Sequence, residues 1–124
     1  GEALDGDREG AKEILDVLVA EKYVDDLRYA TAYAREKSMI SGWGGTKIRY
    51  MLSGKGIPRE TISLALAEID EARAGQRLER LMAAKAKSLK DDPQARLKLL
   101  RFGLGRGYQY DEVVDVIDKY KTDK

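Results

Sequence analysis

The stretch SGWGGTKIRYML, residues 41–52, places the chain's single tryptophan, Trp43, among three glycines at the start of a basic segment. The chain has no cysteine and no histidine, which excludes thiol nucleophiles, Ser–His catalysis and the commonest metal ligands. The order G-W-G-G-T-K differs from the G-x-x-x-x-G-K-[ST] of a phosphate-binding loop, and no strand pattern precedes it. The sequence therefore predicts a protein that is not an enzyme and that uses no metal or cofactor.

Two roles remain for the glycine-rich turn. The free N–H groups of a helix that starts there can bind a phosphate, and Trp43 can stack on an unpaired base. Alternatively, Trp43 packs at the junction between helices, and the glycines allow the tight turn. A lone tryptophan in a small domain is more often part of the core, so we predict a structural role for Trp43 in this turn.

The overall charge of +1 conceals three zones of different sign. Residues 1–26 carry nine acidic and three basic side chains, residues 27–107 carry eight acidic and seventeen basic, and residues 108–124 carry five acidic and three basic. Lysine and arginine bind nucleic acid by releasing counterions from its phosphates. A basic middle is typical of a surface that faces a polyanion, although solvated helix faces give the same composition.

The segment after the tryptophan turn is the strongest candidate for such a surface. If Ile48, Met51 and Leu52 face inward, the basic and aromatic side chains between them face outward. No acidic residue lies between Glu36 and Glu60, and a matching basic segment follows near residue 100. The side chains expected to contact a partner are Lys47, Arg49, Tyr50, Lys55, Arg59, Lys98, Arg101 and Arg106. For Lys55 and Arg106, interaction with a helix C-terminus is the alternative role.

Apolar periodicity predicts helix over nearly the whole chain, in about seven segments and without a strand. A first helix is expected at about residues 8–21, and Asp25 or Asp26 is expected to cap a second helix that ends at the glycines. Pro58 suits the first turn of a later helix, because a proline has no N–H to leave unpaired there.

An internal repeat appears when KIRYMLSGKGIPRETISLAL is aligned with KLLRFGLGRGYQYDEVVDVI at an offset of 51 residues. Gly54 then matches Gly105, and Gly56 matches Gly107. A period in this range is typical of stacked helical repeats. The predicted fold is all-α, with tandem three-helix repeats in an elongated, curved array. Its expected parts are residues 1–25, the last helix of an incomplete first repeat, residues 26–69, a second repeat, and residues 70–124, a third.

The segment YVDDLRYATAYAREKSMISGWGGTKIRYMLSGKGIPRETISLALAEID resembles the central repeat of the RecX family of bacterial recombination regulators. The tail LKLLRFGLGRGYQYDEVVDVI is similar to the third repeat of that family. The resemblance implies a non-enzymatic cytoplasmic regulator, with a truncated first repeat, that binds the RecA recombinase filament on DNA and inhibits its ATPase and strand exchange. Single- and double-stranded DNA are then expected partners through the basic surface, a membrane is not, and the expected state is a monomer.

Two other functions remain open from the residues alone. A stand-alone basic DNA- or RNA-binding module predicts tight binding to bare nucleic acid that weakens steeply with salt. A helical adaptor that binds only protein predicts no such binding. No apolar run approaches the roughly 20 residues that a membrane span needs, so a membrane protein is not expected.

Overall fold

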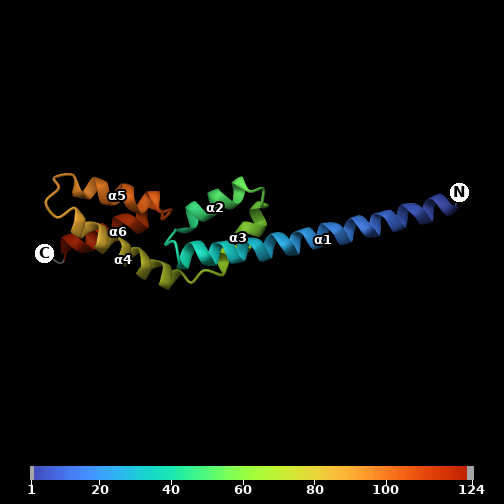
Figure 1. Cartoon of the computed structure of the whole chain (residues 1–124), viewed down its shortest axis with the longest axis horizontal. Helices are drawn as coiled ribbons and strands as arrows, with labels where there is room; N and C mark the ends of the chain where they lie inside the picture. Colours follow the sequence, from blue (N-terminus) through green and yellow to red (C-terminus); the bar gives the residue numbers. More distant parts are fainter. Residues whose placement is uncertain (1, 123–124) are drawn as a thin grey trace.

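The computed structural model describes residues 2–122, with side chains described for residues 10–120, as an elongated array of six α-helices (Figure 1). The helices are α1 (Glu2–Met39), α2 (Gly45–Gly54), α3 (Arg59–Ala67), α4 (Glu71–Ser88), α5 (Ala95–Gly105) and α6 (Tyr110–Thr122). Within the described residues there is no strand, so the predicted all-α class is confirmed.

The predicted break at Asp25 and Asp26 was wrong, because α1 continues through both residues as one helix of 38 residues. No glycine or proline lies between residues 11 and 41, so nothing in this stretch interrupts the backbone hydrogen bonds. Asp25 is exposed on this helix, where an aspartate costs only a few tenths of a kcal/mol in propensity, about 0.7 kcal/mol at most. The helix ends where Gly42 adopts a φ of 72°.

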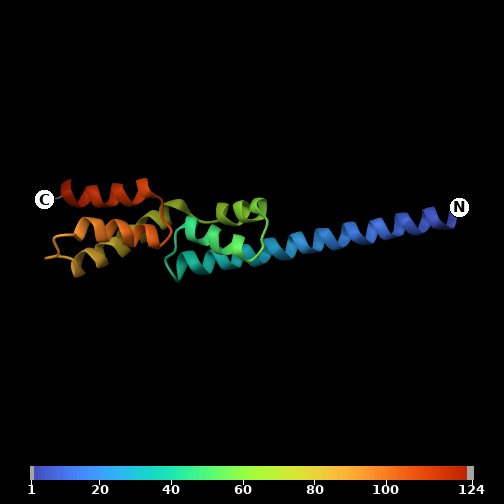
Figure 2. The same ribbon diagram turned by 90° about the horizontal axis from the view of Figure 1, so that it is seen from above.

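The first half of α1 extends beyond the other helices as an arm (Figures 1 and 2). Ile14 and Leu18 on this arm are 63% and 54% exposed, whereas Ala30 and Ala34 in the second half are fully buried. Since successive residues of an α-helix turn by about 100°, these two pairs lie roughly 120–160° apart around the axis. Val19 and Tyr23, 69% and 46% exposed, lie on the same side of the helix as Ala30 and Ala34, so the arm presents apolar side chains all around its axis.

Two separate cores follow along the chain. The N-terminal unit consists of the second half of α1 with α2 and α3, and the C-terminal unit consists of α4, α5 and α6. The first core is formed by Ala30, Ala34, Ile48, Leu52, Ile62 and Ala65. The second is formed by Leu78, Met82, Leu89, Leu99, Tyr108, Val113, Val116 and Ile117. Alanines at two core positions of α1 let α2 and α3 approach its backbone closely.

The internal repeat is visible in the helix boundaries. The last residues of α2 and α5, Gly54 and Gly105, are 51 residues apart, and so are the first residues of α3 and α6, Arg59 and Tyr110. The glycine two residues after the end of α2 and the glycine two residues after the end of α5 both have a positive φ, 84° and 97°. The same turn thus links the second and third helices of both units. The domain bounds given above stay a prediction.

Candidate functional site

The α2 basic surface, which we define as Lys47, Arg49, Tyr50, Lys55 and Arg59, is positioned by the buried side of α2. Ile48 and Leu52 are fully buried, whereas Arg49, Tyr50 and Lys55 are exposed and Lys47 is half-buried beside Trp43. Tyr50 is 77% exposed, and Arg59 is exposed at the first residue of α3. The five residues predicted between positions 47 and 59 therefore lie on α2, at its C-terminal cap and at the first residue of α3. Lys47 and Arg49 lie on opposite sides of α2, about 160° apart around its axis.

Three members of this surface have contacts within the chain. Nη1 of Arg49 donates a hydrogen bond to Oγ of Ser63 on α3, at 3.3 Å. Nζ of Lys55 lies 5.6 Å from the centre of the Tyr33 ring, and Nζ of Lys47 lies 4.4 Å from the Trp43 ring. None of these partners is a carboxylate, so the positive charges of these three side chains are not neutralised by an ion pair. An exposed cation near an aromatic ring gains only about 0.5–1 kcal/mol, so it can still bind an anion.

Trp43 lies half-buried in the turn after α1, against the core of the N-terminal unit. Its ring meets the Tyr33 ring edge-on, with 6.4 Å between centroids. Nζ of Lys37 lies 4.9 Å from the Trp43 ring centre, in addition to the Lys47 contact. Two ammonium groups and a tyrosine therefore surround Trp43 and fix the start of α2 next to the end of α1.

The predicted contacts on α5 are placed differently from those on α2. Nζ of Lys98 is ion-paired with Asp92 and hydrogen-bonded to it, and this bond holds the pKa of the Asp92 carboxyl below its usual value. Arg106 is half-buried and donates a hydrogen bond from Nη1 to the carbonyl oxygen of Ser41, at 3.0 Å. Arg101 is exposed. The basic side chains therefore do not form one uniform stripe across the two units.

The two units are joined by backbone hydrogen bonds between the tryptophan turn and the turn that links α5 to α6. The N–H of Gly44 donates to the carbonyl of Arg106 at 2.7 Å, and the N–H of Thr46 donates to the carbonyl of Gly107 at 3.0 Å. Both N–H groups belong to the first turn of α2 or its cap, where no partner within the helix exists. The C-terminal unit thus supplies the hydrogen-bond acceptors for these two N–H groups at the start of α2.

Glycine is required on both sides of this junction. A Cβ on Gly44 would lie 2.4 Å from the carbonyl oxygen of Gly107, and a Cβ on Gly107 would lie 2.3 Å from Cβ of Lys47. Such distances are far below van der Waals contact, so the backbones approach this closely only because both residues lack a side chain. The glycines beside Trp43 therefore serve contact between the units, besides allowing the turn.

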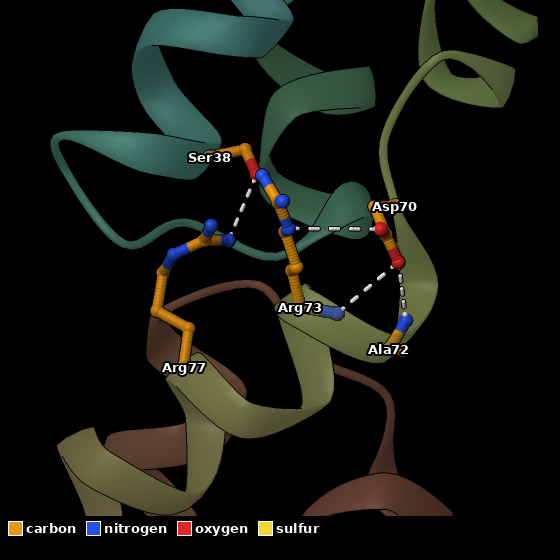
Figure 3. Close-up of polar contacts among 5 residues, drawn as sticks. All are labelled: Ser38, Asp70, Ala72, Arg73 and Arg77. Carbon is orange, nitrogen blue, oxygen red and sulfur yellow. Dashed lines mark hydrogen bonds and ion pairs between the residues drawn. The ribbon is translucent and has the colours of Figure 1, made fainter.

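Side chains of α4 strengthen the same junction (Figure 3). Nη1 of Arg77 donates to Oγ of Ser38 near the end of α1, at 3.0 Å, and Ser38 is only 3% exposed. Asp70 caps α4 by accepting from the N–H groups of Ala72 and Arg73. The hydrogen bond between Arg77 and Ser38 holds the first half of α4 beside the end of α1.

Several residues of this region were missed from the sequence. Lys37, Arg77 and Tyr108 were not predicted to take part, and Arg106 was assigned only an external or helix-terminal role. A signal existed for Lys37, because residues four apart on a helix are neighbours and Tyr33 precedes it by four. The bonds of Arg77, Arg106 and Tyr108 join residues 39–66 positions apart, and no local pattern contains them.

Tyr108 makes the junction sensitive to high pH. Its hydroxyl donates to the carbonyl of Gly42 at 3.1 Å, and burial raises the pKa of Tyr108 above its ordinary value of 10.0. The folded state therefore holds this proton more tightly than the unfolded state. The stabilisation that the protonated Tyr108 hydroxyl gives is complete below pH 10 and is lost as the pH rises through the raised pKa.

We expect the urea midpoint to fall above pH 10, and to fall less in Tyr108→Phe than in the wild type. Exposed Tyr110→Phe is the control, and an unchanged alkaline fall in Tyr108→Phe would contradict this role.

Within residues 2–122 the structure contains no group of three or more carboxylates arranged to hold a metal ion. No helix in this part of the chain is long and apolar enough to cross a membrane.

The fold and the junction define an all-α protein built from three-helix units. Residues 25–66 match the family model described as RecX, second three-helix domain. The chain is 31% identical over 115 residues to Regulatory protein RecX of Clostridium botulinum (strain Eklund 17B / Type B), which covers 90% of this chain and 53% of that protein. It is 34% identical over 110 residues to Regulatory protein RecX of Mycobacterium sp. (strain JLS), which covers 84% of this chain and 60% of that protein.

These matches confirm the resemblance seen in the sequence: residues 25–66 match one RecX domain, and most of the chain is similar to proteins named Regulatory protein RecX. The chain spans about half the length of the curated relatives it matches, with 53% and 60% covered in these two proteins. No solved structure shows significant similarity to it.

Proposed function

We propose that this chain is a non-enzymatic regulator that binds a RecA-type recombinase filament on DNA and inhibits its ATPase and strand exchange. Similarity to proteins named Regulatory protein RecX supports a regulator. The observation that carries the proposal is the α2 basic surface, a group of four cations and one exposed tyrosine without a carboxylate partner. Such a group suits contacts with phosphates and with an unpaired base.

The junction between the units supports the same function. The C-terminal unit is held against the N-terminal unit by backbone hydrogen bonds and by the side-chain hydrogen bonds of Arg106 and Arg77. Arg101 therefore keeps one position relative to α2. A rigid array of this kind can contact successive subunits of a filament without first losing conformational freedom.

A titration of the chain into a RecA-type recombinase that hydrolyses ATP on single-stranded DNA tests the proposal. We expect the ATPase rate to fall at amounts too small to coat the DNA, because a filament-bound regulator acts on many subunits. A fall only at amounts that coat the DNA would indicate competition for DNA instead. That result would favour the stand-alone DNA-binding module.

No effect from a protein that circular dichroism shows to be helical would contradict the proposal for this chain. Strand exchange, measured in the same titration, is expected to fall together with the ATPase rate. The comparison with DNA binding in the same buffer separates loss of filament binding from loss of contact with nucleic acid.

A further inference from the structure

A groove of about 560 Å³ lies where the two units meet, apart from the α2 basic surface. It is lined by the tryptophan turn, the end of α3, the first half of α4 and one side of α6. Figure 2 shows α3 and α6 along one long edge of the molecule, with the start of α4 between them. The groove therefore exists only when the two units are docked.

Apolar side chains form much of the groove. Leu66 and Ile69 come from the N-terminal unit, and Leu78 and Val116 come from the C-terminal unit. Between them lies Gly75 of α4, where a Cβ would have no atom within 4 Å. The groove thus has open space above a small residue, into which an apolar side chain of a partner fits.

The charged groups that line the groove are mostly acidic. They are Glu71 and Glu79 of α4, Glu112 and Asp115 of α6, and one cation, Lys119. Nζ of Lys119 donates to Oε1 of Glu79 at 2.6 Å, so these two charges balance each other. Glu71, Glu112 and Asp115 leave the lining with a net negative charge, and nucleic acid phosphates are repelled from it.

We propose that this groove binds a basic segment of the recombinase, with an apolar side chain seated over Gly75 and lysine or arginine side chains beside the carboxylates. The inference rests on the proposed function for the identity of the partner and adds the site and the chemistry of the segment. Charge complementarity selects a basic protein segment over an acidic one or DNA. The molecule then has two surfaces of opposite charge, one for phosphates on α2 and one for protein between the units.

Gly75→Leu tests the groove by filling it. The new Cβ meets no atom within 4 Å, and leucine replaces glycine inside a helix, so the fold is expected to be retained or stabilised. Ala84→Leu adds bulk at an exposed position of the same helix, outside the groove, and is the matched control. Binding of each variant to the recombinase of the same organism is measured without DNA, and binding to single-stranded DNA is measured separately.

We expect Gly75→Leu to weaken recombinase binding about tenfold or more, since about 1.4 kcal/mol corresponds to a factor of ten. Ala84→Leu is expected to bind as the wild type does, and both variants are expected to keep their affinity for DNA. Equal recombinase binding by Gly75→Leu and Ala84→Leu would overturn the inference. A wild type that binds no recombinase, with or without DNA, would overturn the proposed function itself.

A charge-neutralising variant tests the chemistry of the segment. Glu112→Gln with Asp115→Asn removes two carboxylates from the lining, and Asp111→Asn removes an exposed one in the first turn of α6 that is outside it. We expect the double variant to bind the recombinase more weakly and with less salt dependence, because fewer opposite charges are brought together. Stronger binding by the double variant would show that the bound segment is not basic.

Discussion

Gly44→Ala is expected to lower the free energy of unfolding by about 3 kcal/mol, because its methyl group meets backbone that cannot move aside. The new Cβ would lie 2.4 Å from the carbonyl oxygen of Gly107 and 2.7 Å from the nitrogen of Tyr108. The φ of −82° and ψ of 169° at Gly44 suit alanine, so the loss comes from the clash between the units. Urea unfolding measures it, and the fluorescence of Trp43, the only tryptophan, reports on the turn itself.

The neighbouring glycine is the control for this experiment. Gly45 is the first residue of α2, and a Cβ there has no atom within 4 Å. Gly45→Ala is therefore expected to leave stability unchanged or raise it by up to about 1 kcal/mol. Equal stabilities of the two alanine variants would show that the units are not held at the distance seen in the structure.

Lys47→Glu combined with Arg49→Glu is expected to weaken inhibition of the recombinase ATPase without unfolding the protein. Each residue removed from a phosphate contact lowers the slope of log affinity against log salt by about one, so the slope for DNA should fall by about two. Lys47 also contacts the Trp43 ring, and for that reason circular dichroism and a urea midpoint accompany the assay. The readouts are the ATPase titration and DNA affinity at several salt concentrations.

Lys12→Glu combined with Lys22→Glu makes the same change of charge on the exposed arm of α1. This control separates local contacts from the effect of net charge, and we expect it to inhibit nearly as the wild type does. Undiminished inhibition by a folded Lys47→Glu, Arg49→Glu variant would remove the α2 basic surface from the proposed site.

The helical fold was predictable because its signals are local. Apolar residues at one-face spacing mark α2 to α6, and the glycines that follow α2 and α5 have the positive φ that ends a helix. The error at Asp25 and Asp26 came from treating possible caps as sufficient. A cap residue marks a helix start only when the preceding helix also has a reason to end, and residues 11–41 contain no glycine or proline.

The candidate surface was predictable only in part. The residues of α2 could be placed because the apolar positions of a single helix determine which side chains face outward. The position of Arg106 could not be found in this way, since its partner depends on tertiary packing, and the partner of Lys98 lies outside the helix, six residues earlier in the chain. Asp92 lies before α5, and Ser41 lies 65 residues from Arg106 on the other unit. The role of Gly44 likewise depends on Gly107, which only the folded chain brings next to it.

Because α1 is one continuous helix, the orientation of the side chains on its arm is fixed relative to the N-terminal core. A helix without a break fixes angle as well as distance, at about 100° and 1.5 Å for every residue. The exposed Ile14 and Leu18 therefore keep a fixed rotation about the helix axis relative to the buried Ala30 and Ala34. One residue inserted between the two pairs would move Ile14 and Leu18 by about 1.5 Å along the axis and turn them by about 100° around it. The number of residues in this helix therefore sets the direction in which each side chain of the arm points relative to the N-terminal core.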